Sequence, residues 1–398
     1  MSRTFGFLIL FAIIAGILVG LHYYFWARLV RDPQLTGFLR HLGTGLAIAL
    51  PLLIVGTIAA HRLWRPLGRI LAWPGFIWMG AMFILFVLLL GIDAVRLLFL
   101  LGNRWLGKGD LLDGSRRVLT ARILAGAALA GVGGITAAAV RATQGPIAVK
   151  RIEIVLERLP ASLDGKKIVQ LCDLHVGGLL GRSFVERVVR TVDELGADVV
   201  AIVGDVVDGT IEQLRPALAS LATLRSRHGT FFVTGNHEYY SGSGARAWMD
   251  EFSRMGMRVL INERVAITEG EYAFDIAGVP DHGASRFGKD GPGEDVEAAM
   301  AGRDPSRAVV LLAHQPIAIH EAARLDVDLQ LSGHTHGGQI WPWGALVRLQ
   351  QPFIRGHHRV GNCQLYVSCG TGFWGPPMRL GAPAEITEII LRSGQKPT

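Results

Sequence analysis

Residues 168–175 have the sequence IVQLCDLH, and residues 199–208 have the sequence VVAIVGDVVD. Each segment begins as an apolar run of the length of a buried strand and ends in acidic or imidazole side chains. Three later segments carry related polar groups: GNHE at 235–238, AHQP at 313–316 and GHTH at 333–336. Sites of α/β sheets lie at the carboxyl ends of strands, so these segments predict one such site.

Apolar strand-like runs alternate with helical ones around these segments. A helix is expected where Val185, Val188, Val189 and Val192 share one face, and another at 248–255. The later strands follow one another with few helices between them, which favours two mixed sheets packed face to face. We therefore expect a four-layer α/β/β/α sandwich. Its strands are expected at 168–172, 199–203, 231–233, 272–279, 309–313, 329–331, 365–367 and 386–391, with a further apolar run at 218–224.

Most of the apolar excess lies at the front of the chain, which is 50% hydrophobic with a mean hydropathy of +0.35. A buried bundle in a soluble protein is the alternative to membrane helices, but three successive uncharged runs of over 20 residues disfavour it. No charge interrupts these runs to mark an ion path. We expect a transmembrane region at 1–144, followed by a catalytic domain at 145–398. Four transmembrane helices are expected, at about 4–27, 41–61, 70–92 and 123–140.

The net charge of +7 reflects arginines in the loops between these runs. The loops after the first and third runs carry nine Lys and Arg residues against seven on the opposite side, which favours those loops as cytoplasmic. Arg116 and Arg117 precede an Ala- and Gly-rich run and resemble a twin-arginine export signal. Two ordinary cytoplasmic arginines are the alternative, and both interpretations place Arg116 inside. We expect an integral protein of a bacterial inner or plasma membrane with an extracytoplasmic catalytic domain.

The conspicuous side chains combine carboxylate, imidazole and amide oxygen ligands without thiolate, a set that suits Mn, Fe or Zn. Asp173 and His175 share one face of an extended segment and can bind one ion together. Asp205 is the natural carboxylate to bridge two ions. We therefore expect two divalent metal ions about 4 Å apart. The expected ligands are Asp173, His175, Asp205, Asn236, His314, His334 and His336.

His237 lies beside a ligand but is not needed as one, so it is free to act as a general acid. Asp208 could hold and charge this imidazole, or could instead cap the helix expected near Ile211. Glu238 could contact substrate or bond locally. In the expected reaction, hydroxide formed on the metals attacks phosphorus in line while His237 protonates the leaving oxygen.

These five motifs resemble the signature of the calcineurin-like metallophosphoesterase superfamily, D-x-H, G-D-x-x-D, G-N-H-[DE], H and G-H-x-H. All occur here in order, and the resemblance covers roughly residues 150–392. It implies a metallophosphoesterase fold and activity. It also implies how the ligands are shared: one metal is held by Asp173, His175, Asp205 and His336, and the other by Asp205, Asn236, His314 and His334.

GHTHGGQ at 333–339 and the segment 366–379 look like the bacterial membrane-associated phosphodiesterase branch, whose exported members carry twin-arginine signals. In that branch the position of Cys369 is commonly basic. This departure puts a phosphate-binding role for the position in doubt, and it leaves Arg379 as the candidate substitute.

The expected function is hydrolysis of a phosphodiester, pyrophosphate or phosphomonoester at the membrane, with a lipid-linked ester as one candidate substrate. A nucleotide-sugar-lipid pyrophosphatase of lipid biosynthesis is the alternative enzyme. A non-enzymatic metal-binding membrane protein is the alternative of another class, and the intact ligand set disfavours it. No nucleic-acid partner is expected, because the soluble part shows no basic stripe interleaved with aromatic residues.

Overall fold

The computed structural model describes residues 3–107, 113–287 and 291–394. Its contacts divide the chain into two compact units. The helical unit comprises Met1–Arg141 with Gly375–Met378, and the sandwich unit comprises Ala142–Trp374 with Arg379–Thr398.

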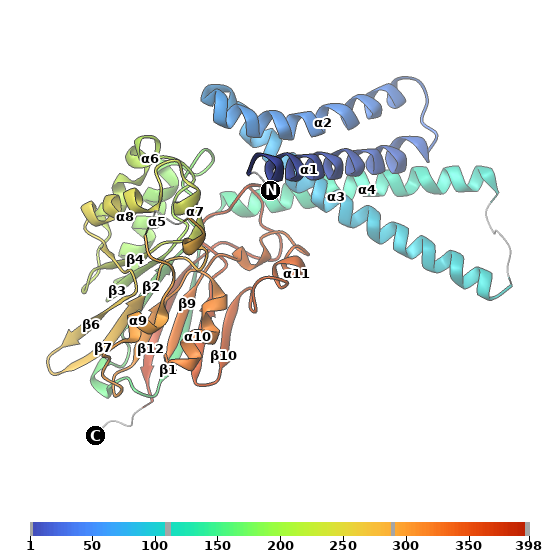
Figure 1. The fold of residues 1–398 in the computed structure, drawn as a ribbon. Coiled ribbons are helices and arrows are strands. Elements are labelled where there is room, and N and C mark those ends of the chain that lie inside the picture. Colours follow the sequence, from blue (N-terminus) through green and yellow to red (C-terminus); the bar gives the residue numbers. More distant parts are fainter. Residues whose placement is uncertain (1–2, 108–112, 288–290, 395–398) are drawn as a thin grey trace. The chain divides into compact units, whose positions relative to one another are not determined.

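Four long helices, shown in blue to green in Figure 1, make up the helical unit. Each contains a stretch long and apolar enough to cross a bilayer, which confirms the four expected helices. The second, third and fourth helices run beyond the uncharged stretches at both ends, and terminal arginine side chains can extend towards water while the backbone stays helical. Their bounds are α1 (Arg3–Trp26), α2 (Gly37–Leu63), α3 (Arg65–Trp105) and α4 (Gly114–Gln144), and a π-helical turn, Ala27–Arg31, follows α1.

Asp93 lies inside α3 rather than at its end, so the apolar helices do contain a charged residue. Its carboxylate accepts hydrogen bonds from Tyr24 Oη at 2.7 Å and from Arg28 Nε at 2.9 Å. Arg28 also pairs with Asp32 at 2.6 Å. The expectation of runs without an internal charge holds for residues 70–92 but misses Asp93, which α3 carries onward to Trp105.

Two six-stranded mixed sheets form the sandwich unit. Neighbouring strands are parallel except in the pairs β12–β2, β10–β11 and β6–β7. The first sheet has the order β1 (Ala148–Leu156), β12 (Glu385–Ser393), β2 (Lys167–Leu171), β3 (Val199–Val203), β4 (Thr230–Val233) and β5 (Arg258–Val259). The second has the order β10 (Gly356–Val360), β11 (Cys363–Val367), β9 (Leu329–Ser332), β8 (Val309–Leu312), β7 (Tyr272–Gly278) and β6 (Glu263–Glu269).

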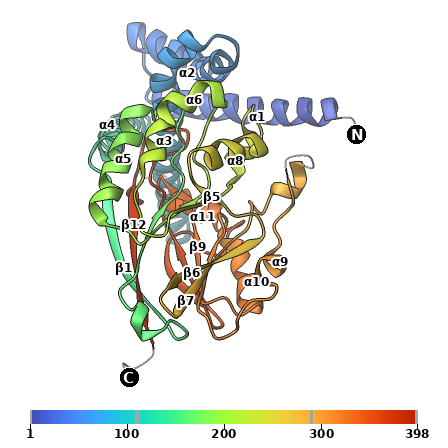
Figure 2. The ribbon, with the colours of Figure 1, turned by 90° about the vertical axis from the view of Figure 1, so that its left-hand side faces the viewer.

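Three apolar cores separate four layers, which confirms the α/β/β/α sandwich. Alternate residues of one strand serve different cores: Val200 and Ile202 of β3 face the helices, whereas Val199 and Val203 face the other sheet. The first sheet is covered by α5 (Arg182–Leu195), α6 (Ile211–Leu218) and α8 (Ala245–Arg254), and the second by α9 (Val296–Met300) and α10 (Ile319–Arg324) (Figures 1 and 2).

The face of α5 shows how the sequence pattern becomes packing. Val185, Val188 and Val192 are fully buried against the first sheet, as their helical spacing predicts. Burial of each such side chain contributes about 1.5–3 kcal/mol. The helix ends at Gly196, which adopts the left-handed conformation (φ 60°) that favours glycine.

Candidate metal centre

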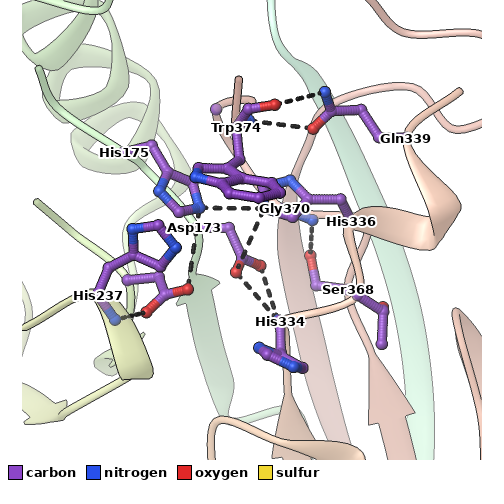
Figure 3. A network of polar contacts seen from close by, with 12 residues as sticks. Asp173, His175, His237, His334, His336, Gln339, Ser368, Gly370 and Trp374 are labelled. Carbon is purple, nitrogen blue, oxygen red and sulfur yellow. Dashed lines mark hydrogen bonds and ion pairs between the residues drawn. The ribbon is translucent and has the colours of Figure 1, made fainter. Parts of the chain in front are cut away.

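The expected ligands all follow strands whose carboxyl ends meet at one edge of the sandwich unit. Asp173 and Asp205 follow β2 and β3, Asn236 begins the short helix α7 (Asn236–Tyr240) after β4, and His314 and His334 follow β8 and β9. Parallel pairing brings these chain ends together. Figure 3 shows the side chains of this edge converging from separate segments.

Five of the seven expected ligands have a positive φ, a conformation uncommon outside glycine: Asp173, His175, Asp205, His334 and His336. Such conformations persist where the surroundings enforce them, and they cluster at functional sites. Glycine permits the close approach: a Cβ added at Gly333 would lie 2.5 Å from Asp173 Oδ2, and one at Gly235 would overlap the Asp205 carboxylate. The backbone therefore turns sharply at these five ligands.

Asp173, His175 and His336 form the first ligand group, and His175 also belongs to an adjoining group with Asp208 and His237. Nε2 of His175 lies 3.0 Å from Nε2 of His336, and Nε2 of His336 lies 3.8 Å from Asp173 Oδ1. All three residues are buried. Two imidazole nitrogens and a carboxylate oxygen therefore converge on one point, as a transition-metal site requires.

Asp205, His314 and His334 form the second group. Nδ1 of His314 donates to the Val203 carbonyl at 2.8 Å, so Nε2 is the nitrogen that faces Asp205 Oδ2, at 3.2 Å. Burial would lower the pKa of His314, but the Asp205 carboxylate raises it, so a metal bound at Nε2 would replace a proton there. Asp205 Oδ2 also lies 3.9 Å from Nε2 of His175, so this carboxylate stands between the two groups.

The donors of both groups fit divalent metals. Asn236 Oδ1 and His314 Nε2 are buried without a hydrogen-bond partner, a cost that a metal ligand would not incur. Burial, followed by the charge of His314, lowers the pKa of His334 to about 4. Burial, followed by His175 and Arg379, also lowers the pKa of His336. Both imidazoles are therefore neutral, which is the form that binds metal.

His237 and Asp208 lie beside the first group. Nδ1 of His237 is 2.5 Å from Asp208 Oδ1, and Asp208 Oδ1 is also 3.2 Å from Nδ1 of His175. Burial would lower the pKa of His237, but Asp205 and Asp208 outweigh it and raise this pKa to about 9. Burial would raise the pKa of Asp208, but the two histidines hold it well below its usual range. Asp208 is not a helix cap, because α6 begins with Ile211 N donating to Ser243 Oγ.

Glu238 supports the site by accepting hydrogen bonds from nearby backbone groups. Its buried carboxylate accepts hydrogen bonds from the backbone N–H groups of Asp205, Val206 and Gly235 at 2.7–3.0 Å. Burial and the neighbouring Asp205 raise its pKa to about 7, against the effect of these donors. Glu238 therefore positions the loop that carries Asp205.

Trp374 is the site residue that the sequence does not reveal. Its indole lies 5.7 Å from the His237 ring and is 55% exposed. Gln339 holds its backbone with two hydrogen bonds, one to Trp374 O at 2.8 Å and one from Trp374 N at 3.0 Å (Figure 3). The centroid of the Tyr240 ring lies 5.3 Å from that of the His237 ring. Two aromatic rings therefore lie close to the expected acid.

Arg379 does not take the phosphate-binding role suggested for it. The guanidinium is buried and donates to backbone carbonyls, among them His336 O and Cys369 O. Its Nη2 lies 3.3 Å from Nδ1 of His336. Cys369 is buried, and burial raises the pKa of its thiol to about 11. Arg379 therefore fixes the loop behind His336 instead of facing a substrate.

One further acidic and imidazole cluster lies in the described part of the sandwich unit, at Asp198, His228 and Glu269. Lys166 Nζ lies 2.6 Å from Glu269 Oε1 and 3.4 Å from Asp198 Oδ1. This ammonium group already balances the carboxylates at the point that a cation would take. The cluster is an ion-pair network and serves as a useful control for the candidate metal centre.

Comparison with known proteins agrees with this geometry. The Calcineurin-like phosphoesterase family profile matches residues 166–338, a range that contains all seven expected ligands. The bovine "Transmembrane protein with metallophosphoesterase domain" is 44% identical over 257 residues, which cover 62% of this chain and 58% of that protein. An uncharacterized metallophosphoesterase of Helicobacter pylori (strain J99) is 40% identical over 61% of this chain and 63% of its own length.

This chain thus spans about three fifths of the length of these two relatives. An uncharacterized metallophosphoesterase of Aquifex aeolicus is matched over 91% of its length, with 35% identity over 61% of this chain. The four apolar helices and the transmembrane relatives together make this a membrane protein. The chain belongs to the calcineurin-like metallophosphoesterase superfamily.

Proposed function

We propose that this protein is a membrane-anchored, dinuclear-metal phosphoesterase that hydrolyses a phosphodiester, pyrophosphate or phosphomonoester. The observation that carries the proposal is the pair of neighbouring ligand groups, in which Asp205 of the second group lies close to His175 of the first, with the His237–Asp208 pair beside them. The first metal would be held by Asp173, His175, Asp205 and His336, and the second by Asp205, Asn236, His314 and His334. The donor set suits Mn, Fe or Zn, and we propose Mn for the first trials.

Bound divalent metals supply Lewis acidity, which activates water at neutral pH and screens the phosphate oxygens. The residues around the metals supply and orient the proton. Asp208 Oδ1 lies 2.5 Å from Nδ1 of His237 and favours the protonated form of this imidazole, whose proton can pass to the leaving oxygen. Asp208 orients the ring through Nδ1, so Nε2 is the nitrogen that donates. The aromatic rings of Trp374 and Tyr240 lie near this imidazole.

A lipid-linked ester is the substrate class that we propose, with a nucleotide-sugar-lipid pyrophosphate as the alternative. Four helices able to cross a bilayer support it, because they keep the sandwich unit close to membrane lipids. We also propose that the protein lies in a bacterial inner or plasma membrane with the sandwich unit outside the cytoplasm. The distribution of loop arginines and the twin-arginine-like pair Arg116 and Arg117 support this orientation and the exported bacterial branch.

The test is hydrolysis of bis(p-nitrophenyl) phosphate and of p-nitrophenyl phosphate by the full chain in detergent, with and without added Mn. Asp205→Asn removes the carboxylate that is proposed to bind both metals, and Asp198→Asn is the matched control in the Lys166 cluster. We expect metal-dependent turnover that Asp205→Asn abolishes and Asp198→Asn preserves. Metal binding without turnover of either ester or of a lipid phosphodiester would favour the non-enzymatic alternative.

A further inference from the structure

An exposed apolar ridge follows the metal-ligand loop of the sandwich unit. It consists of Trp341, Trp343, Leu346 and Leu349, which are 67%, 46%, 50% and 81% exposed and surround the short helix α11 (Gly344–Val347). Large apolar side chains gathered in this way mark a surface for a protein or a membrane.

The ridge is attached firmly to the site. Trp341 N donates to Leu380 O at 2.9 Å, and a Cβ added at Gly338 would lie 2.6 Å from Gly344 Cα. Successive backbone hydrogen bonds from Ile340 to Leu349 hold the turn itself. The ridge therefore cannot fold away without moving the loop that carries His334 and His336.

Charge distinguishes this part of the chain from the rest. Residues 329–384 contain no Asp or Glu, although the whole chain has 33. Arg348 on the ridge is exposed, and so are Arg355 and Arg359 on the following segment. This segment thus joins aromatic and aliphatic side chains with positive charge and contains no acidic residue of its own.

We propose that this ridge enters the boundary between headgroups and acyl chains of an anionic bilayer. Tryptophan favours that depth, and arginine beside an apolar surface favours anionic lipid. The bilayer is also a partner that is always available, because the chain's own helices tether the sandwich unit to it at a high effective concentration. The consequence, which rests on the proposed function, is that His237 and Trp374 face esters in the headgroup layer.

A fluorescent probe on the ridge tests the contact directly. The three native cysteines are buried, so Leu349→Cys in the full chain can be labelled selectively with a polarity-sensitive dye. Tyr272→Cys is the control: Tyr272 is 49% exposed and starts β7, so parallel pairing with β8 places it at the edge opposite the site. Both proteins are reconstituted in phosphatidylcholine vesicles containing about 30% phosphatidylglycerol, a fraction chosen to mimic an anionic membrane surface.

We expect blue-shifted emission at position 349, quenched by nitroxide lipids, and water-like emission at position 272. Omitting phosphatidylglycerol, or adding Arg348→Gln, should reduce the quenching. Water-like emission at both positions would overturn the proposal. A blue shift that lipid-borne nitroxides do not quench would overturn it too, because a protein would then cover the ridge.

A second readout compares two substrates. The double variant Leu346→Ser, Leu349→Ser should lower turnover of a vesicle-embedded phosphodiester by about tenfold or more, because burial of two leucines is lost. Turnover of soluble bis(p-nitrophenyl) phosphate should not change, and Tyr272→Ser should affect neither. Equal turnover of the embedded ester by the double variant and the wild type would contradict the proposal. If no ester is hydrolysed, the proposed function fails while the labelling result still decides the ridge.

Discussion

The proton on His237 is controlled by one carboxylate, which makes a prediction at the level of a single residue. Asp208→Asn keeps the shape of the side chain but removes the charge that helps raise the pKa of His237 to about 9. That pKa should fall by about 1–3 units, because an adjacent opposite charge shifts a pKa by that amount. The acid form is then lost at lower pH, so the alkaline limb of kcat/KM should move down the pH scale.

The leaving group provides the control for this experiment. An alkyl phosphodiester needs the proton more than a nitrophenyl diester does, so Asp208→Asn should slow the alkyl ester more. An alkaline limb that stays in place, with equal losses for both esters, would mean that Asp208 only positions the nearby His175.

A second prediction at the level of a single residue concerns Glu238. Glu238→Ala leaves three buried backbone N–H groups without an acceptor, which should lower the free energy of unfolding by about 3 kcal/mol or more. Metal affinity should fall about 10- to 100-fold, because the loop of Asp205 loses its support. Calorimetric titration with Mn and urea unfolding measure the two effects.

Glu251→Ala is the matched control, since Glu251 is buried on α8 and pairs with Arg215 and Arg254. This variant should lose stability and keep its metal affinity. If both glutamate variants lose affinity equally, the effect on metal binding reflects general destabilisation.

Residue chemistry explains what the sequence predicts at the site and what it does not. Asp173 and His314 stand out because polar ligands close apolar strands, and the structure brings them to one edge. Trp374 carries no such signal, since an indole is ordinary in a core. Its place beside His237 depends on a hydrogen bond with Gln339, 35 residues away. The left-handed backbone at five ligand positions is also invisible before the chain folds.

At the scale of whole elements, the sequence predicts the buried strands and misses the exposed ones. The eight strands expected from apolar runs are the interior strands of the two sheets: β2, β3, β4, β7, β8, β9, β11 and β12. The strands not expected are the four edges, β1, β5, β6 and β10. Edge strands face water on one side and carry charge against further pairing, as in the sequence ERVAITE of β6. The apolar pattern that reveals a buried strand is therefore weak in them.

The polar cluster in α1 and α3 predicts graded effects on the helical unit. Asp93→Ala leaves Arg28 with Asp32 as its described carboxylate partner, and should destabilise the unit by about 1–3 kcal/mol, between an exposed and a buried ion pair. Tyr24→Phe removes one hydrogen bond to the same carboxylate and should cost about 0.6 kcal/mol. Unfolding of the full chain by SDS in mixed micelles measures both. If both variants lose a negligible amount of stability, the cluster does not stabilise the helices.

At the scale of the whole molecule, the division into two units predicts that metal stabilises only one of them. All seven expected ligands belong to the sandwich unit, so a metal that binds the native state should raise the unfolding temperature of that unit alone. At 100 times the Kd the gain is about 2.7 kcal/mol, or roughly 5–10 °C for a unit of this size. Calorimetry of the full chain with Mn, and again after chelation, should show one transition that moves and one that does not. Asp205→Asn should abolish the shift, whereas Asp198→Asn should preserve it, because Lys166 already balances that cluster. A shift that survives Asp205→Asn and disappears with Asp198→Asn would place the metal at the ion-pair network, and with it the origin of the stabilisation.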